Sequence, residues 1–119
     1  MDTTGVGIGP ARLELRRSID ETGQVRLTMI GEVDISNLEQ LHTAIHDVVA
    51  EPEVTSLVLD LQPLDFIDSA GVQVLLRAKR SAERRRVSFG VVNAHGKVLR
   101  VLTILNLHGY LVAPGPVPR

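Results

Sequence analysis

Cysteine and tryptophan are absent from this sequence, and aromatic residues make up only 3% of it. Without cysteine the chain has no disulfide framework, no thiolate zinc site and no cysteine nucleophile. Long apolar runs are also lacking, because Arg100 interrupts the apolar segment 98–102, and no stretch approaches the roughly 20 residues that a membrane span needs. Residues 1–5 contain neither a basic nor an apolar segment, so we expect no secretory signal and a cytoplasmic protein.

Length and composition fit one globular domain. The chain has 119 residues, of which 44% are hydrophobic and 23% charged, which is ordinary for a single folded core. The formal net charge is -1, but residues 1–68 carry 4 Lys and Arg against 13 Asp and Glu, and residues 69–119 carry 9 against 1. Two explanations stay open: a basic partner-binding face, and two halves of one fold that neutralise each other.

The beginning of the chain predicts a β-hairpin. Residues 1–11 contain glycine, proline and threonine without any period, and we expect a flexible leader there. Residues 12–19 and 25–29 alternate between polar and apolar side chains, as half-buried strands do. The turn-forming residues 21–23 lie between them, so the two strands should pair antiparallel.

A helical period follows over 36–49, where Ser36 and Glu39 have the spacing of a capping box. The remaining elements expected from the pattern are a strand at 57–61, a strand-turn-helix unit at 66–86, a strand at 87–92, a helix over 98–105, a short strand at 110–112 and a loose tail at 113–119. The order β-β-α-β-α-β-α predicts one α/β domain over 12–112, with helices covering a mixed sheet.

The segment Asp65 to Gly71 is the most informative for chemistry, because it places a hydroxyl between the end of a strand and the start of a helix. Ser69 or Asp68 can cap the helix by accepting a hydrogen bond from a free backbone N–H. Alternatively, an exposed hydroxyl of Ser69 can accept a phosphoryl group, whose charge is favoured by the positive end of the helix dipole. Local chemistry leaves both roles open.

Three segments of the sequence carry a resemblance to a known family: Gly31-Glu32-Val33-Asp34, the strand Leu57 to Leu61, and Phe66-Ile67-Asp68-Ser69-Ala70-Gly71-Val72. In their order and approximate spacing, the sequence resembles the bacterial STAS family, and within it the small anti-sigma factor antagonists. With the helix pattern near the C-terminus, the likeness covers about Arg12 to Val112. It implies an α/β STAS fold, with a mixed, mostly parallel sheet of four to five strands, an N-terminal β-hairpin and three to four packed helices.

The resemblance also implies a site. In family members that switch, the serine that follows the aspartate of the Asp-Ser-x-Gly element is phosphorylated by a partner that is both anti-sigma factor and ATP-dependent kinase. Here that serine is Ser69. The implied partner-binding residues are Asp34, Asp68, Ser69, Ala70, Gly71 and Gln73. Many members carry a second hydroxyl where this chain has Ala70, so Ser69 is the sole candidate acceptor in the loop.

We therefore expect a regulator, not itself an enzyme, that binds an anti-sigma factor kinase to free a sigma factor and is inactivated by phosphorylation on Ser69. A phosphatase would reset it, and no cofactor, metal, nucleic acid or membrane would be bound directly. The alternative is a non-phosphorylated STAS scaffold, or a sensor of a nucleotide or other ligand at the loops of Asp34 and Ser69. Monomer and weak dimer both stay open, because Leu99 and Ile104 fall off the apolar face of the last helix.

Two other polar clusters have simpler explanations. The basic residues at 77–86 have no interleaved aromatic side chains, so we expect a solvated helix end rather than a nucleic-acid interface. His42 and His46 lie one helical turn apart, a spacing that allows them to share a metal with Glu39. Histidines on an exposed polar face are more often solvated, so we expect no metal site.

Overall fold

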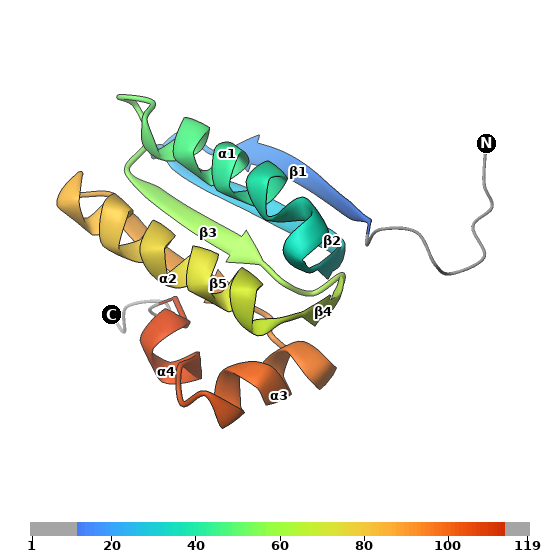
Figure 1. The fold of residues 1–119 in the computed structure, drawn as a ribbon. Coiled ribbons are helices and arrows are strands. Elements are labelled where there is room, and N and C mark those ends of the chain that lie inside the picture. The colour runs from blue at the N-terminus through green and yellow to red at the C-terminus, as the bar shows by residue number, and fades with distance from the viewer. Residues whose placement is uncertain (1–11, 114–119) are drawn as a thin grey trace, which may run out of the picture.

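A computed structural model describes residues 12–113, so the expected leader at 1–11 and the tail beyond Ala113 lie outside it. In this range, helices cover a five-stranded sheet (Figure 1). The strands are β1 (Leu13–Ile19), β2 (Gln24–Val33), β3 (Ser56–Asp60), β4 (Leu64–Ile67) and β5 (Ser88–Val92). The helices are the 3-10 turn η1 (Ile35–Asn37), α1 (Leu38–Val49), α2 (Ser69–Arg84), α3 (Gly96–Ile104) and α4 (His108–Leu111).

Strand β2 holds the sheet together. It pairs antiparallel with β1, parallel with β3 along its first half and parallel with β4 along its last residues, and β5 continues the sheet beyond β3. The register of β2 shifts between Gly31 and Glu32, where Gly31 has a φ of +111° and a side chain would collide with the Arg12 carbonyl. The predicted hairpin, the mostly parallel sheet and the interior position of β3 are confirmed.

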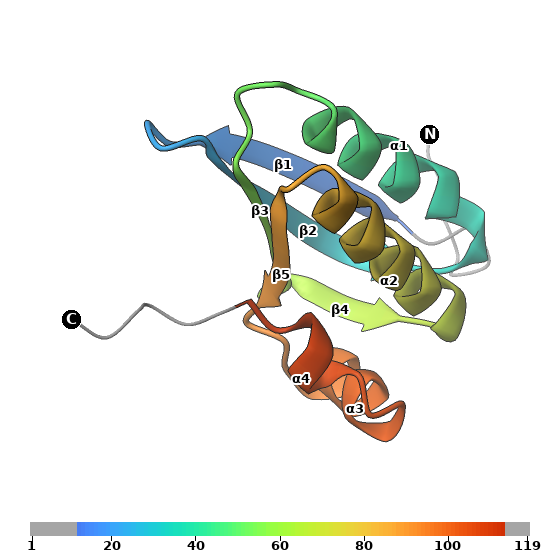
Figure 2. The same cartoon turned by 90° about the vertical axis from the view of Figure 1, so that its left-hand side faces the viewer.

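Helices α1 and α2 lie side by side over one face of the sheet (Figures 1 and 2). In β2, Val25, Leu27 and Met29 are buried, whereas Arg26 and Thr28 between them are half-buried, as expected for a strand with one covered face. The predicted apolar stripes of the two helices complete the core with Leu41, Ile45, Val48, Val49, Val72 and Leu75. Burial of such a side chain contributes about 1.5–3 kcal/mol, so packing between α1, α2 and the sheet dominates the stability of the fold.

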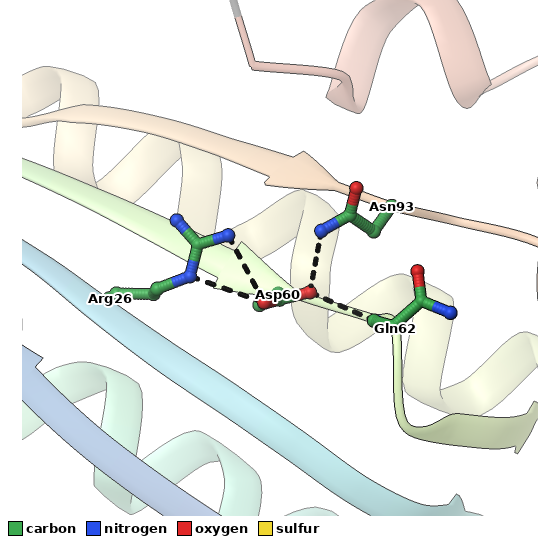
Figure 3. A network of polar contacts seen from close by, with 4 residues as sticks. All are labelled: Arg26, Asp60, Gln62 and Asn93. Carbon is green, nitrogen blue, oxygen red and sulfur yellow. Dashed lines mark hydrogen bonds and ion pairs between the residues drawn. The ribbon is translucent and has the colours of Figure 1, made fainter.

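A polar network on the sheet ties three neighbouring strands together (Figure 3). Asp60, at the end of β3, accepts hydrogen bonds from Arg26 of β2 at 3.2 Å, from Asn93 after β5 at 2.9 Å and from the Gln62 backbone N–H at 3.0 Å. Partial burial raises the pKa of Asp60, but the hydrogen bonds from Asn93, Gln62 and Arg26 outweigh it and hold the pKa below its usual value. Asp60 is therefore a carboxylate at neutral pH, matched to the Arg26 guanidinium.

The predicted capping box of Ser36 and Glu39 is wrong. The capping box joins Asp34 and Asn37, where the Asp34 backbone N–H donates to Asn37 Oδ1 at 3.1 Å, and Ser36 instead donates its hydroxyl to Asp34. The difference arises because η1 intervenes between β2 and α1, so the N-cap is Asp34, two residues before Ser36.

Short elements account for the other differences. The expected strand at 110–112 is wrong: α4 occupies most of that segment and buries Leu111, and only Val112 forms a β-bridge, to Val91. The predicted order counts one strand between the first two long helices, whereas the structure has two, β3 and β4, and five strands are within the expected number. The strand of the unit predicted at 66–86 corresponds to the end of β4. In the last long helix, Leu99 is half-buried, whereas Ile104 is 74% exposed.

Candidate functional site

Two aspartates follow neighbouring parallel strands at one edge of the sheet. Val33 at the end of β2 is the register partner of Ile67 at the end of β4, and the Asp68 backbone N–H donates to the Val33 carbonyl oxygen at 3.1 Å. Asp34 and Asp68 are the next residues in the chain. Because adjacent strands lie about 4.8 Å apart, the fold brings these two residues, predicted from separate motifs, into one site.

Ser69 is the first residue of α2 and is exposed. Its predecessor Asp68 is the N-cap, whose carboxylate accepts a hydrogen bond from the Gly71 backbone N–H at 2.9 Å. Of the two capping residues that the sequence allows, Asp68 therefore has this role. The Ser69 hydroxyl forms no hydrogen bond with any residue in the range 12–113, so it is available to a second molecule.

Gly71 determines how closely the first turn of α2 approaches the sheet. A side-chain carbon at this position would lie 2.7 Å from Val33 Cγ1 and 2.7 Å from Ile67 Cγ1, which is shorter than real contacts allow. The helix start thus packs directly on the ends of β2 and β4. This packing holds Ser69 at the edge where the two aspartates follow their strands.

Hydrogen bonds keep Asp34 ionised. The Ser36 hydroxyl donates to Asp34 Oδ1 at 2.6 Å and the Ser36 backbone N–H donates to the same oxygen at 2.8 Å. These bonds, the one from the hydroxyl first, hold the pKa of Asp34 below its usual value. The positive end of the α2 dipole therefore faces a site that already carries negative charge.

The remaining predicted partner-binding residues differ in exposure. Gln73 is exposed and Ala70 half-buried, so both present surface at the start of α2. Gly71 is buried in the packing described above. Partner contacts by Ala70, Gly71 and Gln73 stay predictions. Because Gly71 is buried, it would affect partner binding only through the position that it gives to Ser69.

Two exposed apolar residues lie beside the site residues in the chain and were missed from the sequence. Ile35, directly after Asp34, is 79% exposed, and Phe66 of β4 is 36% exposed. The sequence contains one signal that Ile35 is exposed, because Ile35 falls outside the apolar stripe that Leu38, Leu41 and Ile45 form in α1. Apolar surface next to charged groups is typical of a protein-binding patch.

The other polar clusters lie outside this site. His42 and His46 stack on α1 with their ring centroids 6.3 Å apart. Over residues 12–113, no group of three His, Cys, Asp or Glu side chains converges as metal ligands would. The basic residues at 77–86 occupy the second half of α2 and the turn after it, away from Ser69.

Residues 17–113 match the family model described as Mlab, STAS domain. The chain belongs to the STAS domain family. The anti-sigma-F factor antagonist RsfB of Mycobacterium tuberculosis is 37% identical to it over 81 residues, which are 68% of this chain and 64% of RsfB. The aligned part of this STAS domain thus spans just under two thirds of that relative.

Solved structures share the fold of this STAS domain. An anti-sigma factor antagonist from Mycobacterium paratuberculosis has a TM-score of 0.75 at 25% identity, covering 87% of this chain and 86% of that one. The anti-sigma factor antagonist SpoIIAA in its unphosphorylated form has a TM-score of 0.69 at 22% identity, covering 86% and 90%. The predicted STAS fold and the likeness to anti-sigma factor antagonists are confirmed, and these relatives are regulators rather than enzymes. No helix in the described range is long and apolar enough to cross a bilayer.

Proposed function

We propose that this STAS domain is an anti-sigma factor antagonist that binds an anti-sigma factor with kinase activity, frees a sigma factor and is inactivated by phosphorylation on Ser69. The observation that carries the proposal is the unbonded, exposed hydroxyl of Ser69 at the start of α2, where Asp68 alone serves as the cap. The likeness to RsfB, an anti-sigma-F factor antagonist, supports the partner class. The proposed setting is the cytoplasm, where a phosphatase removes the phosphate.

The unmodified site suits a protein partner. Ile35 and Phe66 supply apolar area, while Asp34 and Asp68 supply carboxylates for cationic groups of the partner. Between these groups, the first turn of α2 presents Ser69, Ala70 and Gln73 to the partner. The kinase acts here with its bound ATP. The Ser69 oxygen attacks the γ-phosphorus and bonds to it, the bond between that phosphorus and the oxygen bridging to the β-phosphate breaks, ADP leaves, and the hydroxyl proton passes to a base of the kinase.

A phosphate on Ser69 changes the site more than the fold. It adds about -1.5 to -2 charges at pH 7 next to two carboxylates, and it enlarges the residue at the centre of the contact. The free backbone N–H groups and the dipole at the start of α2 stabilise a phosphate there, so the domain remains folded. The partner meets repulsion and steric overlap instead, so the modified protein dissociates.

The test is the intact mass of the protein after incubation with each anti-sigma factor kinase of its host and ATP. We expect a phosphate-sized mass increase for the wild type and none for Ser69→Ala, which should still bind the kinase. Ser18→Ala is the matched control, since it removes an exposed hydroxyl on β1, outside the site, and should leave the mass increase unchanged.

Two results would contradict the proposal. A mass increase that persists in Ser69→Ala would assign phosphorylation to another residue. No increase with a kinase that phosphorylates another antagonist in parallel would favour the non-phosphorylated scaffold or ligand sensor.

A further inference from the structure

A hollow of about 270 Å³ opens between α1 and α2, mostly along the half of α2 that ends at Arg84. We call it the α1–α2 groove. Its lining comes from one stripe of each helix: His42, Ile45, His46 and Val49 on α1, and Val74, Arg77, Ala78, Arg80, Ser81, Arg84 and Arg85 on α2 or just after it. The two helices run side by side over the sheet (Figure 1), so the groove lies on the helical face of the molecule.

The groove combines an apolar floor with a basic rim. Ile45, Val49 and Val74 are buried and Ala78 is half-buried, whereas the four lining arginines are exposed or border solvent. A side chain entering the groove would therefore meet apolar atoms below and guanidinium groups above. This arrangement is that of a recognition surface and differs from a uniformly solvated helix face.

The four arginines of the rim are unpaired in the described part of the chain. No ion pair or side-chain hydrogen bond joins Arg77, Arg80, Arg84 or Arg85 to any residue in the range 12–113. By contrast, the three arginines of β1 and β2, Arg16, Arg17 and Arg26, each contact a carboxylate.

No carboxylate of α2 neutralises this rim. Glu83, the single acidic residue after position 68, is 3.2 Å from Lys79 Nζ and is absent from the groove lining. On the opposite wall, Asp47 lies 3.8 Å from His46 and also stays outside the lining. Like charges one helical turn apart oppose folding, so the groove retains a charge that a second molecule can satisfy.

We infer that the α1–α2 groove docks an acidic amphipathic segment of a partner protein, with apolar side chains in the hollow and carboxylates on the arginines. Guanidinium groups suit this occupant because they bind carboxylates in a bidentate geometry. The hollow is smaller than the pockets of about 300–1,000 Å³ typical of small-molecule sites, and it holds a few side chains of a peptide. Its lining has no Phe, Tyr or Trp on which nucleic-acid bases would stack.

This surface is separate from the Ser69 site. At a rise of about 1.5 Å per residue, the arginines lie about 12 Å to about 24 Å along α2 from Ser69. That separation exceeds the Debye length of about 8 Å at physiological ionic strength, so a charge on Ser69 has little effect at the groove. The groove therefore stays available whether or not Ser69 is phosphorylated, which goes beyond the proposed switch.

The experiment titrates the full chain against a fluorescein-labelled peptide in which glutamate pairs alternate with leucine pairs, read by fluorescence anisotropy at about 0.15 M salt. We expect saturable binding that weakens about tenfold or more when every glutamate of the peptide is replaced by glutamine. The double variant Arg80→Glu/Arg84→Glu should weaken binding similarly. Arg100→Glu, an exposed arginine of α3 outside the groove, is the matched control and should change affinity by less than about twofold.

Two further variants test the shape of the groove and its independence from Ser69, apart from the charge of the arginines. Ser81→Trp fills the hollow without changing the charge and should weaken binding clearly, and circular dichroism checks that the variant folds. Ser69→Asp should leave peptide affinity unchanged within about twofold, whatever its effect on the anti-sigma factor partner. The docking proposal and the Ser69 phosphorylation proposal can therefore be contradicted independently of each other.

Three outcomes would overturn the inference. Unchanged affinity in Arg80→Glu/Arg84→Glu would remove the groove as the binding site. Tighter, Arg80-dependent binding of an oligonucleotide of about 20 thymidines would assign it to nucleic acid. Self-association in analytical ultracentrifugation that Arg84→Glu abolishes would assign it to a second copy of this chain.

Discussion

At the scale of single residues, neighbouring positions at the start of α2 have different structural roles. Asp68 satisfies the helix end by accepting from Gly71 N–H, Ser69 keeps its hydroxyl unbonded, and Gly71 leaves room for the ends of β2 and β4. A serine that also had to cap the helix would lose part of its freedom as an acceptor. Because Asp68 is the cap, the Ser69 hydroxyl is left available for the proposed role as phosphoryl acceptor.

The substitution Gly71→Ala tests this packing. The added carbon would approach Val33 and Ile67 to 2.7 Å, so we expect overpacking to lower the free energy of unfolding by about 1–3 kcal/mol. Urea unfolding measures it. Gly109→Ala in α4 is the matched control, because nothing lies within 4 Å of the added carbon, and it should change stability by less than about 0.5 kcal/mol. Equal stability of the two variants would show that α2 can move away from the strands at no cost.

At the scale of the elements, the strands are joined by charge as well as by backbone pairing. Asp60 binds Arg26 and Asn93, so its carboxylate links β3 to the strand on either side (Figure 3). The folded-state pKa of Asp60 is lowered, and the hydrogen bonds contribute stability only while the group is ionised. That contribution is complete above the unfolded-state pKa and is lost as the pH falls through the folded-state pKa.

The replacement Asp60→Asn should therefore flatten the acid side of the stability profile. We expect the wild type to lose more stability than the variant between about pH 5 and pH 2, and both to change in parallel above about pH 6. Chemical denaturation at a series of pH values measures the difference. Glu53→Gln, an exposed carboxylate without an ion pair in the described range, is the control. Parallel curves for wild type and Asp60→Asn throughout would contradict the role given to the network.

Element length decided how well the sequence predicted the fold. The long periodic segments, 25–29 with its hairpin partner and the apolar stripe of 41–49, were correct because several side chains repeat the same period. The elements of three or four residues, η1, β4 and α4, were missed or misassigned, since so few positions do not distinguish a helix from a strand. Their form depends on tertiary contacts, such as the burial of Leu111.

The candidate site was predictable in part for a similar reason. Asp34, Asp68 and Ser69 belong to motifs, but the choice of Asp68 over Ser69 as the cap needs the backbone geometry, because both residue types cap helices well. The α1–α2 groove was not predictable. The sequence contains its arginines, but only the fold shows that they face α1 and that their carboxylate partners are missing.

At the scale of the whole molecule, charge is separated between the two ends of α2. Asp34 and Asp68 stand at its start, and the unpaired arginines of the α1–α2 groove stand toward its end. The interpretation that two oppositely charged halves merely neutralise each other does not hold for those arginines, because no carboxylate in the range 12–113 reaches them. A basic surface without internal partners costs stability, and the proposed docking of an acidic segment would offset that cost.

Replacing Arg80 by Glu tests whether this cost is present. The new carboxylate would stand three residues after Arg77 and four before Arg84, so two like-charge pairs of α2 become attractive ones. It would also stand three residues before Glu83, so one attractive pair becomes repulsive and offsets part of the gain. We expect the free energy of unfolding to rise by about 0.5 kcal/mol at low salt and the gain to shrink in about 1 M salt, as denaturant unfolding would measure. Arg80→Gln should show about half the gain, because it removes repulsion without adding attraction. A destabilised Arg80→Glu would mean that the arginines are already neutralised within the folded chain, and the α1–α2 groove would then have no unsatisfied charge to offer an acidic partner.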